Sequence, residues 1–112
     1  MKTEDRIQQE IVIWYTNNYC LSHHNPQCLI AHIPNEGQQR LVGVGVLPGF
    51  SDLIVIHATQ HAPPTTVYFE VKTPTGTQSP AQKKFQARIT TLGFQYHIVR
   101  SLEEFANVVG IL

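Results

Sequence analysis

Two β-rich runs in the middle of the chain constrain the fold more than any other feature. Residues 52–57 (DLIVIH) and 66–72 (TVYFEVK) are dominated by β-branched and aromatic residues, which favour strands. A polar connection containing Pro63-Pro64 joins them, so the sequence predicts an antiparallel hairpin with a fairly long loop. If the loop is centred near His61, Asp52 lies opposite Glu70.

The pairing of Asp52 with Glu70 has a chemical consequence. Like charges directly opposed on two strands are destabilising unless something compensates them. A divalent cation is the simplest compensator, since Mg²⁺ usually binds through one or two carboxylates plus waters and substrate phosphate. Lys72 projects to the same face as Glu70, whereas Val71 points into the core. The pattern predicts two metal-binding carboxylates and one ammonium at a strand end, with an ordinary surface ion cluster as the alternative.

Helix and strand signals surround this hairpin. Thr3 is placed to cap an amphipathic helix that ends near Tyr19, and Ser79-Pro80-Ala81-Gln82 is a capping-box helix start. The glycine-rich passage over 35–50 must bend tightly. The predicted order is α-β-β-β-α-β-α, with strands over 29–33, 52–57, 66–72 and 94–99, a helix over 80–92 that stops at Gly93, and a last helix over 102–109 opened by a capping box of Ser101 and Glu104. This is an α/β chain in the broad sense, with one mixed sheet flanked by helices.

Length and composition bound the class of protein. A chain of 112 residues, 42% hydrophobic and 14% charged, predicts one folded domain over 1–112 and excludes intrinsic disorder. Eight Lys plus Arg balance eight Asp plus Glu, and this neutrality argues at first sight against a chain that coats nucleic acid. Two cysteines are too few for a secreted disulfide framework, which predicts the reducing cytoplasm. No apolar run approaches the roughly 20 residues that cross a bilayer, so no membrane association is expected.

Further polar residues are candidates for the same site. Glu10 lies at the edge of the apolar face of the first helix, where an unpaired carboxylate is costly to bury; it either faces the site or is solvated. Gln82, in the first turn of the following helix, is near enough in sequence to lie beside the site, although its capping role is a sufficient explanation. Lys83, Lys84 and Arg88 form either a solvated helix face or a set of phosphate contacts.

A second metal hypothesis involves a short loop. Cys20, His23, His24 and Cys28 are zinc-ligand types, but four ligands within so short a segment close a cramped loop, whereas zinc sites usually draw on two separated ligand pairs. A small zinc-binding protein is therefore a minor alternative.

Several segments spread over nearly the whole chain carry a family resemblance. They are Gly-Val-Leu-Pro-Gly-Phe-Ser-Asp-Leu at 45–53, Phe-Glu-Val-Lys-Thr-Pro-Thr-Gly at 69–76, Ser-Pro-Ala-Gln-Lys-Lys-Phe at 79–85, Leu-Gly-Phe at 92–94 and Val-Arg-Ser at 99–101. Together they resemble the VRR-NUC (virus-type replication-repair nuclease) branch of the PD-(D/E)XK superfamily. The sequence departs from that pattern at Ser51, where the family usually has proline before the Asp.

The resemblance implies a restriction-endonuclease-like core and a metal-dependent phosphodiesterase. It implies Asp52, Glu70 and the Val71 backbone carbonyl as ligands of Mg²⁺ or Mn²⁺, with Lys72 at the attacking water. Glu10 and Gln82 match supporting polar positions of the family, Glu10 also as a metal-site carboxylate.

Small stand-alone members of this branch look like homodimeric resolvases of branched DNA. We therefore expect a structure-specific DNA endonuclease that resolves four-way (Holliday) junctions. The alternatives are a flap or general structure-specific nuclease and a non-catalytic DNA-binding module of the same fold. Bound cations would cancel acidic charge at the site, so the neutral composition does not exclude a DNA substrate.

Overall fold

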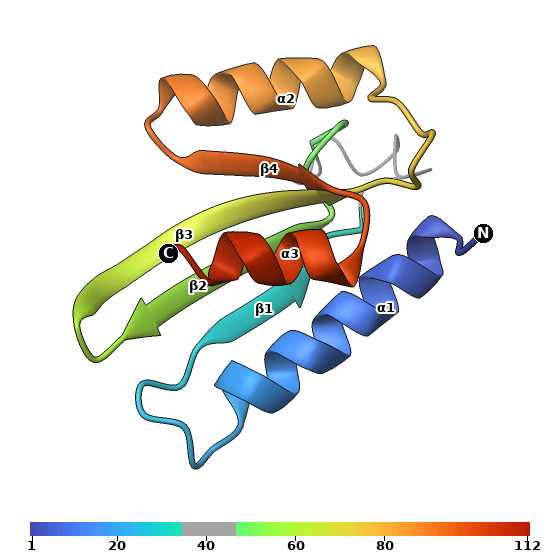
Figure 1. Cartoon of the computed structure of the whole chain (residues 1–112). Coiled ribbons are helices and arrows are strands. Elements are labelled where there is room, and N and C mark those ends of the chain that lie inside the picture. Colours follow the sequence, from blue (N-terminus) through green and yellow to red (C-terminus); the bar gives the residue numbers. More distant parts are fainter. Residues whose placement is uncertain (35–46) are drawn as a thin grey trace.

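The chain folds into a mixed sheet with helices on both faces (Figure 1). The computed structural model describes residues 1–34 and 47–112. Within them the elements are α1 (Glu4–Tyr15), the π-helical turn η1 (Thr16–Cys20), β1 (Leu29–His32), β2 (Leu53–Thr59), β3 (Ala62–Val71), α2 (Pro80–Thr91), β4 (Gln95–Val99) and α3 (Leu102–Val109). The strands are ordered β1-β2-β3-β4, with β4 parallel to β3 and the other pairs antiparallel. The predicted fold class is confirmed. Most of the predicted glycine-rich passage, over 35–46, lies outside the described residues.

The central hairpin has the predicted register. Leu53 pairs with Phe69 and Val55 with Val67, so the positions of Asp52 and Glu70 come next along the two chains. Along each strand, successive side chains point to opposite faces of the sheet, so Asp52 and Glu70 face away from Leu53 and Phe69. The register therefore carries both carboxylates to the face opposite the core.

The hairpin turn is tighter than predicted. β2 runs to Thr59 and β3 begins at Ala62, so Pro63 and Pro64 lie inside a strand rather than in a long loop. The register shifts after His57, and β4 pairs with β3 only from Val67 onward. The prolines are tolerated because they lie where the ladder is irregular and where β3 has a neighbour on one side alone.

The hydrophobic core lies between one sheet face and helices α1 and α3, which cross that same face in Figure 1. Alternate residues of β2 and β3 supply the sheet side of the core, among them Leu53, Val55, Val67, Phe69 and Val71. The helices supply Ile7, Ile11 and Tyr15 from α1 and Phe105 and Val109 from α3. Val71 points into this core as predicted.

Helix α2 packs on the other face through an aromatic cluster. Phe85 of α2 lies 4.4 Å from Phe50 and 6.0 Å from both Tyr68 and Tyr96, measured between ring centroids. The helix begins with the predicted capping box: Ser79 Oγ accepts from Gln82 N at 3.2 Å and Gln82 Oε1 accepts from Ser79 N at 2.8 Å. The first turn of α2 is thereby fixed over the sheet face that carries the two carboxylates.

The terminal helices follow the sequence signals with small differences. Thr3 caps α1, which ends at Tyr15, and the π-helical turn then continues to Cys20. Ser101 caps α3 as predicted, but Glu104 Oε1 accepts from Arg100 N at 2.8 Å instead of from Ser101 N. The predicted second capping box is therefore wrong: the Glu104 side chain accepts from the backbone amide one residue before the cap. Among the described helices, none has the length and apolar character needed to cross a membrane.

Candidate functional site

Asp52, Glu70 and Lys72 converge where the β2–β3 pair ends. Asp52 Oδ2 accepts a hydrogen bond from Val71 N at 2.7 Å, and Lys72 Nζ lies 3.6 Å from Glu70 Oε2. Lys72 N donates to Val99 O at 3.0 Å, which extends the pairing with β4 and fixes the lysine backbone. The structure thus brings together the three residues that the strand pattern placed on one face.

The Glu70 carboxylate is fully buried, with 0% of its surface exposed. Its Oε1 accepts from the Tyr96 hydroxyl and from Gln78 Nε2, the latter at 3.0 Å. Its Oε2 has no hydrogen-bond partner among the residues that the structure describes. A buried polar atom without a partner costs about 1–3 kcal/mol, and more when it is charged. A divalent cation would satisfy this oxygen, so the donor set fits a metal.

The surroundings of Asp52 also disfavour its ionised form. Burial is the main cause that raises its pKa, and the charges of Glu70 and Glu4 raise it further. The Val71 amide and the Lys72 ammonium oppose this rise. A bound cation would act in the opposite direction to the neighbouring carboxylates and favour the ionised form.

Two acids at the start of α1, Glu4 and Asp5, lie beside this site. They line a hollow of about 190 Å³ together with Asp52, Gln8 and His32. His32 Nδ1 lies 3.0 Å from Asp52 O and 3.1 Å from Gln8 Nε2, which ties the start of the strand to α1. Sequence reasoning did not select Glu4 for the site. The sequence places Glu4 in the first turn of the helix, one turn before Gln8, but it does not show which end of the sheet this turn meets.

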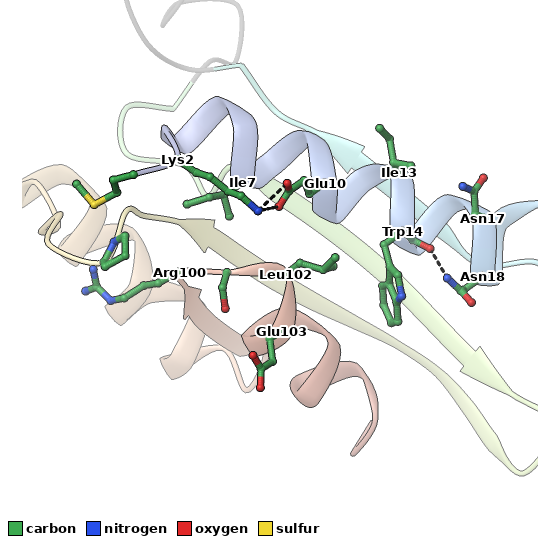
Figure 2. Close-up of a pocket in the computed structure, with 13 residues that line it drawn as sticks. Lys2, Ile7, Glu10, Ile13, Trp14, Asn17, Asn18, Arg100, Leu102 and Glu103 are labelled. Atoms are coloured by element: carbon green, nitrogen blue, oxygen red, sulfur yellow. Dashed lines mark hydrogen bonds and ion pairs between the residues drawn. The ribbon is translucent and has the colours of Figure 1, made fainter.

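The structure does not bring Glu10 to Asp52 and Glu70. Its carboxylate pairs with Lys2 Nζ at 2.8 Å and with Arg6 Nε at 3.5 Å, and Figure 2 shows Lys2 reaching along α1 to Glu10. The hydrogen bond from Lys2 is the main cause that lowers the pKa of Glu10. Glu10 lines a groove of about 920 Å³ with residues of α1 and α3, among them Trp14. Six residues separate it from Glu4, roughly 240° around a helix, so the two acids face different partners.

The side chain of Gln82 accepts its hydrogen bond within the capping box, and the glutamine that contacts Glu70 is Gln78. Gln78 Nε2 also donates to Gln86 Oε1 at 2.8 Å. Sequence reasoning missed Gln78 because it lies in a connection without periodicity. It also missed Tyr96, although alternation along β4 places Tyr96 on the same face as Glu70.

The three cations predicted to contact nucleic acid lie on α2 and are exposed. Lys83 follows Gln82 directly, and Lys84 and Arg88 line a hollow of about 370 Å³ with Phe85 and Pro48. Lys84 and Arg88 are one helical turn apart, so these two side chains can contact the same anionic ligand.

The short Cys and His segment is arranged differently from a zinc site. Cys28 is buried, and its Sγ lies 3.3 Å from Ala58 N and 3.4 Å from Ala58 O. His24 Nδ1 accepts from Leu21 N at 2.9 Å. Over residues 1–34 and 47–112, no group of three or more His, Cys, Asp or Glu side chains is placed to hold a metal ion. A metal at Asp52 and Glu70 would therefore complete its shell with backbone or water oxygens, as Mg²⁺ commonly does.

Comparisons with known proteins agree with this geometry. The family model of the VRR-NUC domain matches residues 2–103. A solved structure described as a VRR-NUC domain protein has a TM-score of 0.76 and 20% sequence identity, and the match covers 99% of this chain and 88% of that one. At that identity the likeness shows the fold. No curated protein matches the sequence. The chain therefore belongs to the VRR-NUC domain family, a family of nuclease-type DNA-processing domains.

Proposed function

We propose that this protein is a Mg²⁺- or Mn²⁺-dependent endodeoxyribonuclease that acts on branched DNA, preferably four-way junctions, as a homodimer. The observation that carries the proposal is the buried Oε2 of Glu70, which lacks a hydrogen-bond partner among the described residues and lies beside Asp52 and Lys72. A buried carboxylate oxygen without a hydrogen-bond partner is costly, and such groups are concentrated at functional sites.

Asp52, Glu70 and the Val71 carbonyl would hold the ion, and the acids of α1 beside it would be Glu4 and Asp5 rather than Glu10. A bound divalent ion supplies a Lewis acid that activates water and offsets charge on the phosphoryl oxygens. The hydrogen bond from Val71 N holds Asp52 through Oδ2.

Lys72 would orient the attacking water and stabilise the negative charge that develops on the phosphate. Its side chain is only 10% exposed, so its ammonium is weakly screened and acts strongly at short range. Its backbone bond to Val99 O keeps the side chain at the strand end, next to Glu70.

The DNA backbone would lie along α2. Lys83, Lys84 and Arg88 are exposed there, and α2 covers the sheet face that carries Glu70. A two-fold dimer suits a four-way junction because it presents two active sites to two symmetry-related strands.

The test compares labelled four-way junctions, flaps and linear duplexes with Mg²⁺ or Mn²⁺ present. Glu70→Gln is expected to reduce cleavage to the level seen in excess EDTA, whereas Glu103→Gln, a matched change of an exposed acid on α3, is expected to cleave like the wild type. Cleavage that survives in Glu70→Gln or in EDTA would contradict the proposed site.

Product mapping and light scattering separate the remaining candidates. Symmetric paired nicks from a dimer are required of a junction resolvase. Single nicks near a flap would instead identify a flap nuclease. DNA binding without cleavage of any substrate would identify a non-catalytic module.

A further inference from the structure

The two oxygens of the Glu70 carboxylate have unequal surroundings. Oε1 accepts two hydrogen bonds, from the Tyr96 hydroxyl and from Gln78 Nε2. A carboxylate oxygen offers about two lone-pair positions, so these donors fill Oε1. Oε2 accepts none within the described part of the chain and faces Lys72 Nζ at 3.6 Å. Only one oxygen of Glu70 is therefore open to a cation.

We propose that Tyr96 and Gln78 are positioning residues that confine Glu70 to binding a cation through Oε2 alone, and that they thereby make the site favour Mg²⁺ and Mn²⁺ over Ca²⁺. The inference rests on the proposed function, since it presupposes that Glu70 is a metal ligand. It concerns the choice of ion, which the proposed function leaves open.

Both donors are held so that they donate. Tyr96 pairs with Tyr68 in the parallel register of β3 and β4, and its ring packs against Phe85. The ring is thereby fixed so that its hydroxyl donates to Glu70 Oε1.

The Gln78 amide is oriented by a second bond. Its nitrogen also donates to Gln86 Oε1 at 2.8 Å, so both hydrogens of the amide are used. Gln86 belongs to α2, so the helix that covers this sheet face also sets which end of the Gln78 amide meets Glu70.

Ion size and coordination connect this geometry to selectivity. Mg²⁺ demands near-octahedral geometry and is bound through one or two carboxylates, whereas Ca²⁺ takes six to eight oxygens and often uses both oxygens of one carboxylate. Two-oxygen binding by Glu70 would displace at least one hydrogen bond from Oε1 and leave either the Tyr96 hydroxyl or the Gln78 amide without that acceptor. The arrangement therefore penalises Ca²⁺ more than Mg²⁺ or Mn²⁺.

The experiment is calorimetric titration of the full chain with MgCl₂, MnCl₂ and CaCl₂, without DNA. Variants are Tyr96→Phe and Gln78→Leu, and the matched control is Tyr68→Phe, the same change at the residue that pairs with Tyr96. We expect the dissociation constants for Mg²⁺ and Mn²⁺ to rise about tenfold in both variants, the usual scale for removing a group that orients a metal ligand. The Ca²⁺ constant should not rise, so the preference over Ca²⁺ should fall about tenfold, and Tyr68→Phe should keep it.

Each other outcome overturns the inference in a recognisable way. An unchanged preference in Tyr96→Phe and Gln78→Leu refutes the positioning role and leaves the proposed nuclease site standing. An equal loss of affinity for all three ions, together with a lower melting temperature, reports a loosened fold and refutes it as well. If the wild-type chain binds none of the ions, the proposed metal site fails together with the inference. If Tyr96→Phe does not fold, Gln78→Leu alone decides.

Discussion

Gly49 is a position where an added methyl group should destabilise the fold for two reasons: its backbone conformation and its close approach to α2. Its φ is +79°, in the left-handed region, and a Cβ built there would lie 2.4 Å from the carbonyl carbon and oxygen of Ala81 and 2.7 Å from Gln82 N. Gly93 has a comparable φ of +93°, but a Cβ there meets nothing within 4 Å. The pair Gly49→Ala and Gly93→Ala therefore shares the conformational cost and differs in the contact with α2.

The expected magnitudes follow from these distances. A left-handed conformation costs a residue with a Cβ about 1–2 kcal/mol, which is the full expectation for Gly93→Ala. At Gly49 the loop and the first turn of α2 would also have to separate by roughly 1 Å to restore ordinary contact, and overpacking of this kind adds about 1–3 kcal/mol. Gly49→Ala should therefore lose about 2–5 kcal/mol, or roughly 8–20 °C in melting temperature.

Thermal and urea denaturation of the two variants measure the difference, and a junction-cleavage assay measures its effect on the site. Ser51 and Asp52 follow Gly49 closely, and Ser51 is buried with its hydroxyl donating to Leu53 O. We expect Gly49→Ala to lose cleavage even at temperatures where it is folded, whereas Gly93→Ala should retain it. Equal stability losses in the two variants would refute the idea that close packing of this loop on α2 positions Asp52.

Three further changes test other parts of the molecule. Burial lowers the pKa of His57 below its ordinary value. The stability that neutral His57 contributes is therefore complete above about pH 6.5 and is lost as the pH falls toward the lowered pKa, by at most about 1.4 kcal/mol per pH unit. His57→Gln should flatten this part of a stability profile measured by urea unfolding. Lys84→Ala and Arg88→Ala should each weaken junction binding and reduce its salt dependence by about one unit of slope in filter-binding assays, whereas Lys2→Ala, which removes a cation paired on α1, should not. Arg100→Met removes the guanidinium that donates to two backbone carbonyls just after Lys72. Single-turnover cleavage should therefore slow while junction affinity stays within about twofold. An unchanged rate would contradict a positioning role for Arg100.

The sequence predicted the backbone of the site because its signals are local or nearly so. The turn centre fixed the strand register, and the register fixed the shared face of Asp52 and Glu70. Ser79 and Gln82 predicted the start of α2 to the residue. The misplaced loop at Pro63 arose because prolines usually mark connections, whereas here the strand has room for them beside an irregular pairing.

The side chains that complete the site could not be predicted in the same way. A helical wheel shows that Glu10 borders an apolar face, but not whether that face meets the sheet end or another helix. Glu10 pairs with Lys2 and Arg6, and Glu4 faces Asp52 instead. Gln78 was invisible for another reason: its role depends on a buried acceptor from β3 and an amide from α2, and neither proximity leaves a periodic trace in the sequence.

The distribution of charge explains how a formally neutral chain can bind DNA. Lys2 and Arg6 are engaged by Glu10 on α1, whereas α2 has no Asp or Glu among its residues and exposes Lys83, Lys84 and Arg88. Glu70, on the sheet face that α2 covers, belongs to the candidate metal site, so metal binding would reduce its repulsion of a DNA phosphate there.

Junction affinity should therefore be low in EDTA, rise with Mg²⁺ and fall steeply with salt in both conditions. Fluorescence anisotropy with the Lys72→Ala variant, which holds cleavage off, measures this directly. Affinity that is the same with and without Mg²⁺ would show that the cations of α2 bind DNA without help from the metal site.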